Sequence, residues 1–452
     1  MTDVSELRTS KRRSTTGHQP DVERGEDALA KLQDGIYWDK GTTPPRCFAI
    51  AFFKADREAT ALGVAALLTR LVALWDGLKD ERLADLPGVR VPRSGFEWLI
   101  GFGIKAFKIG GAAKQLPRRL DTPNIFNSVD PAGGGGKVLD GSGLDYAKGL
   151  ALNPASEEIC VQFTGDTPLS VSRAIVETWK LIESARDPAT GRSALALSAS
   201  FTGFNREDQR SWLGFHDGLS NLESGSARKS VIAVKRQGLP PIDRWTVDGT
   251  YMAFMRLAVD LRQWEQLGLQ EQETLVGRTR ITGCPLRAAH VAGQAQTVDG
   301  CPAPGSNEVT GDGNEAFREP PDGVDEVITK SHVQRANHHF QPQRIYRQGY
   351  EFAEMPMPGR PLAVGLNFVS FQDNPDRLFG ILKNEGWLGA TNFGGAPGPQ
   401  LLTALAAGVF FCPARDDAEL FPGASIFPTL VAAVDGPVRV RTRSAGRGTR
   451  RV

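Results

Sequence analysis

Short apolar runs alternate with stretches of helical hydrophobic spacing along the first half of the chain. The runs are typical of buried strands, and the spacing is typical of amphipathic helices. Together they predict a strand at 47–53, a helix at 57–75, strands at 96–100 and 159–163, a helix at 170–186 and a strand at 194–201. This order of strand, helix, strand, strand, helix, strand is that of a ferredoxin-like unit.

A looser version of the same order returns in the second half. The pattern predicts a strand at 249–259, a helix at 261–267, strands at 344–347 and 362–371, a helix at 377–384 and a closing strand at 408–412. The predicted fold class is therefore α+β, with two ferredoxin-like halves whose antiparallel sheets pack together or enclose a cavity.

Changes in composition set the expected limits of the domains. Residues 1–28 form a basic, polar N-terminal tail that we expect to be disordered, and residues 437–452 form a basic C-terminal tail. Between them we expect an N-terminal half at 29–225 and a C-terminal half at 226–436.

The charge balance excludes several classes of partner. The 452 residues include 53 Lys and Arg against 52 Asp and Glu, so no overall field favours nucleic acid or an anionic membrane. We expect no membrane span, because no apolar run approaches the roughly 18–20 residues required and the longest candidates are broken by charge or glycine. The basic run 11–13 leads into polar residues and not into the apolar stretch of a secretion signal, which predicts a cytoplasmic protein.

Cysteine and glycine patterns also narrow the chemistry. The five cysteines are odd in number, scattered and without a Cys-x-x-Cys spacing, so we expect neither a structural disulfide nor a cysteine metal site. Four glycines at 133–136 precede Lys137, but Val138 follows where a phosphate-binding loop needs Ser or Thr. That segment is predicted to be a surface loop.

Three side chains are candidates for chemistry. His332 lies in a predicted short helix or turn at 331–339, and Arg347 follows in a strand-like run. Asp217 precedes Gly218 in a predicted tight turn. Each residue also has an ordinary explanation, because histidines are often exposed, arginines often form structural ion pairs, and Asp-Gly is a common turn pair. Taken one at a time, they leave the function open.

A metal site built from His332, His338 and His339 is a second interpretation of the same segment. Side chains of adjacent residues diverge on both helices and strands, so His338 and His339 cannot easily share an ion. No His-Glu-x-x-His motif accompanies them. This interpretation is disfavoured.

Taken together, the motifs resemble the dye-decolourising (DyP-type) peroxidases, haem enzymes of the dimeric α+β barrel superfamily. The resemblance rests on the Gly-Phe-His-Asp-Gly turn at 214–218, the Ser-His-Val at 331–333 with Asn337, and the Arg-Gln-Gly-Tyr at 347–350. Segments 271–278, 283–286, 365–372 and 409–413 also look like parts of the family. The likeness runs in order from about residue 32 to 413.

This resemblance implies one haem b per chain, in a pocket of the C-terminal half. His332 would be the proximal ligand of the iron, Asp217 the distal carboxylate and Arg347 the distal arginine. The other residues implied to contact the cofactor are Gly218, Leu219, Ser220, Asn337, His339 and Phe368.

The resemblance also implies an activity, in which hydrogen peroxide oxidises dyes, phenols or similar organic donors through an oxoferryl intermediate. Asp217 would carry a proton as base and then as acid, and Arg347 would stabilise negative charge. Bulky donors would be oxidised at the surface through an aromatic relay, for which the candidates are Trp212, Tyr346, Tyr350 and Trp387.

Two departures from the family pattern concern the cofactor. No acid precedes the closing strand to accept a proton from the proximal imidazole, and only Gln400 could substitute. His338 and His339 stand where relatives often have Pro-Arg.

Alternative functions stay open as well. A haem carrier or sensor without peroxidase activity is one, and a non-haem protein of the same fold is a weaker one. An oligomer is compatible with the sequence, as is docking of a partner or a shell through the tails.

Overall fold

The computed structural model describes residues 31–38, 44–82, 88–91, 94–120, 144–146, 157–219, 221–222, 226–291, 294–297, 325–336, 344–382 and 401–427. All statements below concern these residues.

The first half of the fold consists of four strands and two long helices. Their order is β1 (Cys47–Ala55), α1 (Ala61–Lys79), β2 (Glu97–Phe102), β4 (Ile159–Gly165), α3 (Pro168–Ser184) and β5 (Leu195–Phe204). The strands are antiparallel and lie side by side as β2-β4-β1-β5. Each predicted element of this half is present, in the predicted order.

The second half repeats this strand order with shorter helices. Its elements are β6 (Thr250–Val259), α5 (Leu261–Trp264), α6 (Leu269–Val276), β9 (Tyr346–Glu354), β10 (Ala363–Gln372), α9 (Asp376–Leu382) and β11 (Leu402–Cys412). The sheet order β9-β10-β6-β11 matches that of the first half position by position. The prediction of two ferredoxin-like halves is confirmed.

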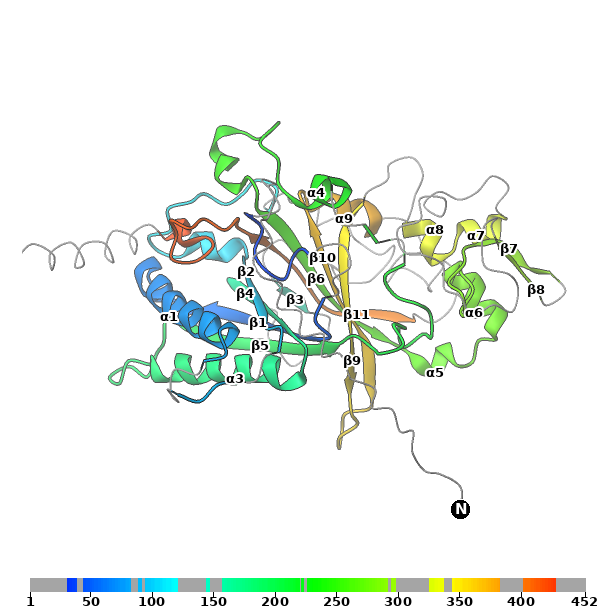
Figure 1. Cartoon of the computed structure of the whole chain (residues 1–452), viewed down its shortest axis with the longest axis horizontal. Coiled ribbons are helices and arrows are strands. Elements are labelled where there is room, and N and C mark those ends of the chain that lie inside the picture. The colour runs from blue at the N-terminus through cyan, green and yellow to red at the C-terminus, as the bar shows by residue number, and fades with distance from the viewer. Residues whose placement is uncertain are drawn as a thin grey trace, which may run out of the picture.

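Two narrow seams join the halves into one closed sheet. At one seam β5 pairs with β9 through Phe204 and Glu351, and at the other β2 pairs with β11 through Phe102 and Phe411. The short strand β3 (Leu144–Tyr146) pairs with β11. The sheets therefore enclose an interior, which is the second of the two predicted arrangements (Figure 1).

Alternation along each strand divides the apolar side chains between this interior and the outer faces. Phe48, Phe52, Phe254, Tyr350 and Phe410 share the interior cluster, which draws on both halves. One polar link crosses it. Gln162 of β4 donates a hydrogen bond to Gln348 of β9 at 3.1 Å, and Gln348 donates to the carbonyl of Gly35 at 2.8 Å.

Helices α1 and α3 cover the outer face of the first sheet (Figure 1). Thr60 and Thr167 cap their N-termini by accepting hydrogen bonds from the amides of Gly63 and Ser170. Inside this layer the indole of Trp75 donates to Thr178 at 2.8 Å. The two helices fill this face with apolar side chains.

By length and composition alone, the segment Ala61–Lys79 is apolar enough to cross a membrane. The expectation that no apolar run reaches this length was therefore wrong. More than half of this helix is buried against the first sheet, and a core helix passes the same test.

The outer face of the second sheet has a different cover. Met255, Leu257 and Val409 on the strands pack with Leu378 and Ile381 of α9. The partly buried residues that pack against this cluster include Phe368 of β10 and Ala336 of helix α8 (His332–Ala336). The segment bearing His332 thus lies over the second sheet.

Several elements were not predicted. They are β3, α4 (Ser226–Ile232), α7 (Glu326–Thr329), the hairpin of β7 (Leu286–Val291) and β8 (Gln294–Thr297), and three 3₁₀ turns at Ile104–Lys108, Pro241–Thr246 and Ala424–Ile426. Each is too short to carry a clear hydrophobic period. The tails and the glycine run at 133–136 lie outside the described residues. The domain limits stay a prediction.

The expectation of no disulfide was wrong, because Cys284 is disulfide-bonded. Spacing along the chain does not report which distant cysteines approach each other in space. Cys47, Cys160 and Cys412 are free and buried.

We predict that the joint between the halves depends on packing in the enclosed interior. Phe410 is fully buried there, with its ring 5.8 Å from that of Phe52. Phe410→Ala should lower the free energy of unfolding by about 3–5 kcal/mol, measured by urea denaturation followed by circular dichroism. Leu169→Ala, at a side chain on α3 that is 57% exposed, is the control and should change it by less than about 0.5 kcal/mol. Equal losses in both variants would contradict the prediction.

Candidate functional site

Strand β9 places three functional positions on one side of the sheet. Its Tyr346 and Tyr350 lie in the enclosed interior. Because successive side chains of a strand point to opposite faces, Arg347, Gly349 and Glu351 share the outer face. The candidate site is built on this outer face.

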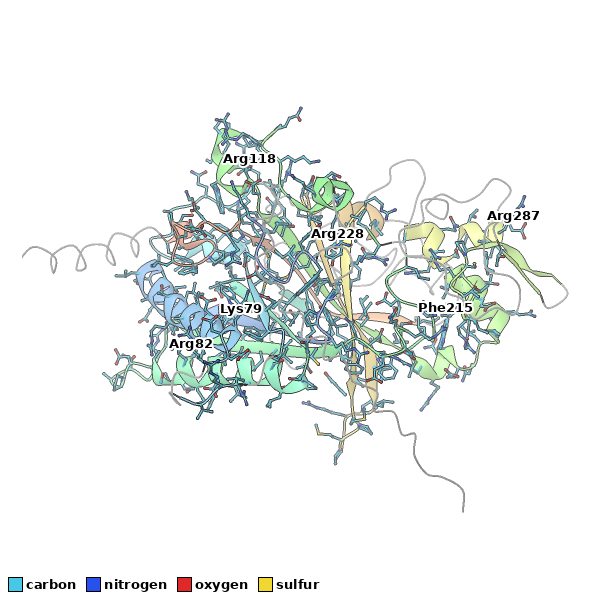
Figure 2. The ribbon with its side chains drawn as sticks, in the orientation of Figure 1. Lys79, Arg82, Arg118, Phe215, Arg228 and Arg287 are labelled. Carbon is cyan, nitrogen blue, oxygen red and sulfur yellow. The ribbon has the colours of Figure 1, made fainter. Side chains whose placement is uncertain are left out.

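The loop that carries Asp217 folds over β9 and is anchored by Arg210. The Arg210 guanidinium donates hydrogen bonds to the carbonyls of Gly214 at 2.7 Å, of Ile281 at 3.0 Å and of Arg280. Phe215 packs its ring against Trp264 of α5, with centroids 6.1 Å apart, and is labelled in Figure 2. The turn is thereby tied to the segment that follows α6.

Asp217 lies directly above Gly349. A Cβ added to Gly349 would come within 2.6 Å of the Asp217 Oδ2 atom, so no larger residue fits there without moving the carboxylate. The amide of Gly218 donates to Oδ1 at 2.7 Å, and Gly218 adopts the left-handed conformation with φ near 80°. Asp217 itself is exposed. Its carboxylate is therefore held against β9 and open on its other side.

The backbone and side chain of Arg347 are fixed by the same loop. Asn221 accepts a hydrogen bond from the Arg347 amide at 3.1 Å and donates one to its carbonyl at 2.8 Å. The guanidinium donates to the carbonyl of Leu219 at 3.0 Å. Arg347 and Asp217 thus lie near each other on one surface, both held by the same loop.

A glycine at the end of α6 sets the position of the histidine helix. Gly277 closes α6 in the left-handed conformation, and a Cβ there would lie 2.2 Å from the Ser331 Oγ atom. Ser331 is buried, and its hydroxyl makes no hydrogen bond within the described residues. His332 follows as the first residue of α8. The close approach of Gly277 and Ser331 therefore fixes the position of the start of α8, and with it the position of His332.

The surroundings of His332 favour its neutral form. Burial lowers the pKa of the imidazole to about 3, and the positive charges of Arg347 and Arg278 contribute. Burial, together with Arg347, also lowers the pKa of Arg278 to about 10. A neutral imidazole has a nitrogen lone pair that can bind a metal ion, and the two guanidinium groups favour an anionic ligand nearby. This donor set fits haem, which offers both an iron ion and carboxylates.

Glu351 is a further acid at this site, which sequence reasoning missed. It is 5% exposed, its Oε1 atom makes no hydrogen bond within the described residues, and its Oε2 atom accepts one from the Trp212 amide at 3.4 Å. Burial raises its pKa to about 8, and the negative charge of Asp217 adds to the effect. The only sequence signal was an acid within the apolar run 350–353.

The other predicted contacts divide into two groups. Phe368 pairs in register with Gly349 and so shares its face, while Leu219 and Gly218 follow Asp217 in the loop. Ser220, Asn337 and His339 lie outside the described residues, as do His338, Trp387 and Gln400. The described residues contain no cluster of three or more His, Cys, Asp or Glu that could hold a metal ion.

The proposed aromatic relay residues are not equally placed. Trp212 is half-buried, lies under the Arg206 guanidinium at 4.9 Å and donates to the carbonyl of Phe352 at 2.8 Å. Tyr346 and Tyr350 point into the enclosed interior, where Tyr350 stacks on Phe48 at 4.5 Å. Of the described candidates, Trp212 alone belongs to the loop that holds Asp217.

Comparison with known proteins agrees with this geometry. Residues 208–417 match the family described as Dyp-type peroxidase, C-terminal. This match contains Asp217, His332, Arg347 and Glu351.

Curated relatives and solved structures extend the likeness. A protein of Escherichia coli O6:K15:H31 named Deferrochelatase is 24% identical over 324 residues, which cover 70% of this chain and 64% of the relative. The chain therefore spans just under two thirds of the length of the curated relatives it matches. Ferric DtpA from Streptomyces lividans has a TM-score of 0.61 at 21% identity, covering 89% of this chain and 98% of that one. The DyP-type peroxidase from Cellulomonas bogoriensis has a TM-score of 0.58 at 19% identity, with 88% and 99% covered. These structures share the fold.

We predict that the ionisation of Glu351 is visible in stability. Its pKa is about 8 in the folded chain against an ordinary value of 4.5, so the folded protein keeps a proton that the unfolded chain releases. The resulting stabilisation is complete below about pH 4.5 and is lost as the pH rises through about 8. Relative to Glu351→Gln, the wild type should lose up to about 1.4 kcal/mol of unfolding free energy per pH unit in this window.

Urea titrations of the two proteins at a series of pH values test this. Glu207→Gln, at a side chain that is 87% exposed, is the control and should track the wild type. A difference between wild type and Glu351→Gln that stays constant with pH would show that Glu351 is ionised throughout.

Proposed function

Because the chain belongs to the family of Dyp-type peroxidases, we propose that it is a haem-dependent peroxidase that uses hydrogen peroxide to oxidise an organic electron donor such as a dye or a phenol. The observation that carries the proposal is that Asp217 lies over Gly349, Arg347 is held by the same loop, and burial with Arg347 and Arg278 favours a neutral His332.

His332 would hold the iron of haem through its imidazole. Arg278 and Arg347 offer positive charge to the carboxylates of the cofactor and to peroxide. Phe368 and Leu219 would provide apolar contacts to the ring. Bound haem would supply an iron centre at which peroxide is reduced and from which the donor is oxidised.

Asp217 would move the proton of peroxide. Its carboxylate is held by the Gly218 amide on one oxygen, and the other oxygen is kept in place over Gly349. A carboxylate within hydrogen-bond reach of peroxide can take a proton from one oxygen and return it to the other, which leaves as water.

Arg347 would stabilise the negative charge that develops on peroxide as its proton is removed. Its guanidinium is always charged and is oriented by the Leu219 carbonyl. Such a preorganised charge in a half-buried site is commonly worth about 2–4 kcal/mol of barrier.

A haem-binding protein without peroxidase activity is the second candidate. The curated relatives that the chain matches are named deferrochelatases and are longer than the matched region. A carrier needs His332 but has no use for a paired carboxylate and guanidinium, so the presence of Asp217 and Arg347 favours catalysis.

We predict that His332→Ala abolishes the specific Soret absorbance of the protein reconstituted with haemin. The expected cause is loss of the nitrogen ligand to iron. His216→Ala is the matched control, since His216 is adjacent to Asp217 and hydrogen-bonds the Ile281 backbone. An unchanged Soret band in His332→Ala would overturn the ligand assignment.

We also predict that Asp217→Asn and Arg347→Ala bind haem but turn over slowly. Loss of the proton carrier should reduce kcat/KM for peroxide by about 10²–10⁴-fold. Loss of the guanidinium should reduce it by about 10²–10³-fold. The exposed variants Glu58→Gln and Arg82→Ala serve as controls in steady-state assays with a dye. A wild type with a normal Soret band and no turnover would establish the carrier instead.

A further inference from the structure

Glu351 is a buried acid beside the proposed proton carrier. On the outer face of β9 it lies two residues beyond Gly349, over which the Asp217 carboxylate is placed. Consecutive same-face positions of a strand are roughly 6.6 Å apart, which is within the combined reach of two carboxyl side chains. Arg347 occupies the opposite flank of Gly349. Asp217 thus lies between a permanent cation and a second acid.

Within the described residues, each of the two acids accepts a hydrogen bond through only one of its carboxyl oxygens. Asp217 uses Oδ1 to accept from Gly218, and Oδ2 lies over the strand. Glu351 uses Oε2 to accept from Trp212, while Oε1 is buried without a partner in the described part of the chain. A carboxylic acid can donate through such an oxygen, whereas a carboxylate cannot. A proton held there satisfies a buried atom that otherwise costs stability.

The charged groups around Glu351 come from two segments. Asp217 belongs to the loop above β9, and Arg206 and Asp208 follow β5. The two aspartates favour the protonated acid, and Arg206 opposes them. Burial is the largest influence and also favours the protonated form.

An open cavity lies beside charged groups that act on Glu351. Phe204 pairs with Glu351 at the seam between the halves and lines an open cavity of about 560 Å³. Arg206 and Asp208 line the same cavity. Water in this cavity therefore reaches Arg206 and Asp208, two of the charged groups that act on Glu351.

We propose that Glu351 and Asp217 share one proton, and that Glu351 is a positioning residue which stores this proton for Asp217 and regains it from the cavity at the seam. The proposal rests on the proposed peroxidase function. It assigns a role to a residue outside the pair of Asp217 and Arg347.

The reaction consumes protons, which a proton stored on Glu351 could supply. Reduction of one hydrogen peroxide to two waters consumes two electrons, taken from the organic donor, and two protons. Glu351 breaks its O–H bond as Asp217 gains one, and Asp217 passes that proton to an oxygen derived from peroxide. Glu351 then takes a replacement proton from solvent. No other reductant is required.

The shared proton is tested by infrared spectroscopy of the purified full chain with its haem. The spectrum of the wild type minus that of Glu351→Gln should contain a carboxylic acid C=O band at about pH 6 that disappears as the pH rises through about 8. In an Asp217→Asn background the same band should titrate at lower pH, because the charge that raises the pKa of Glu351 is gone. Subtracting Glu207→Gln should give no such band. Absence of the band at about pH 6, or a titration unaffected by Asp217→Asn, would overturn the shared proton.

The role in turnover is tested by pH profiles of kcat/KM for peroxide. The wild type should lose activity as Glu351 ionises, while Glu351→Gln should be about tenfold slower at neutral pH and lack this alkaline limb. Glu351→Asp, which keeps a carboxyl group, should restore part of the rate. A Glu351→Gln profile that keeps the wild-type shape would refute the role. If the wild type has no peroxidase activity, the proposed function fails while the infrared result still decides whether the two acids share a proton.

Discussion

The alternation of side chains along β9 is the constraint on which the rest of the site depends. One set of residues, Tyr346, Gln348 and Tyr350, enters the enclosed interior and joins the two halves. The other set, Arg347, Gly349 and Glu351, faces the loop that carries Asp217. Because the period of a strand is two, a slip of one residue would exchange the sets, burying the arginine in the interior and exposing the tyrosines. The packing of the barrel therefore fixes the register of the chemistry.

The electrostatics of the site depend on burial more than on ion pairing. Burial is the largest cause of the lowered pKa values of His332 and Arg278 and of the raised pKa of Glu351. Neighbouring charges then reinforce each shift. The result is a neutral imidazole, two guanidinium groups and a protonated acid within one region. Exposed at the surface, such groups would keep their usual pKa values. The shifted pKa values come from the segments that bury these groups, namely the Asp217 loop and helix α8.

The sequence predicted the order of the elements well, because hydrophobic periodicity directly reflects which faces are buried. Its errors have physical causes. The strand predicted at 344–347 extends as β9 to Glu354, since Gly349 and Glu351 interrupt the apolar alternation. Helix α1 is as long as the predicted segment 57–75 but begins and ends four residues later, and it was not recognised from the sequence that this helix is apolar enough to span a membrane.

The candidate site was predicted in part. Asp217, His332 and Arg347 were identified from motifs, but their meeting depends on tertiary contacts such as Arg210 with the carbonyls of 280 and 281. Glu351 was missed because strand alternation predicts which side of the sheet a residue faces, but it does not predict which loop covers that side. The disulfide of Cys284 was missed because the spacing of cysteines along the chain does not show which of them come together in the fold.

The two seams have a broader consequence. Each joins the halves through a single pair of residues, so the backbone contributes little to the joint and the interior side chains contribute most. In this respect the molecule is a dimer contained in one chain, with the barrel interior as its subunit interface. A symmetric dimer must use both copies of a surface alike, but a fused one is free to differentiate them. Here the outer face of the first sheet is covered by α1 and α3 and has a structural role, while the outer face of the second sheet carries the candidate site.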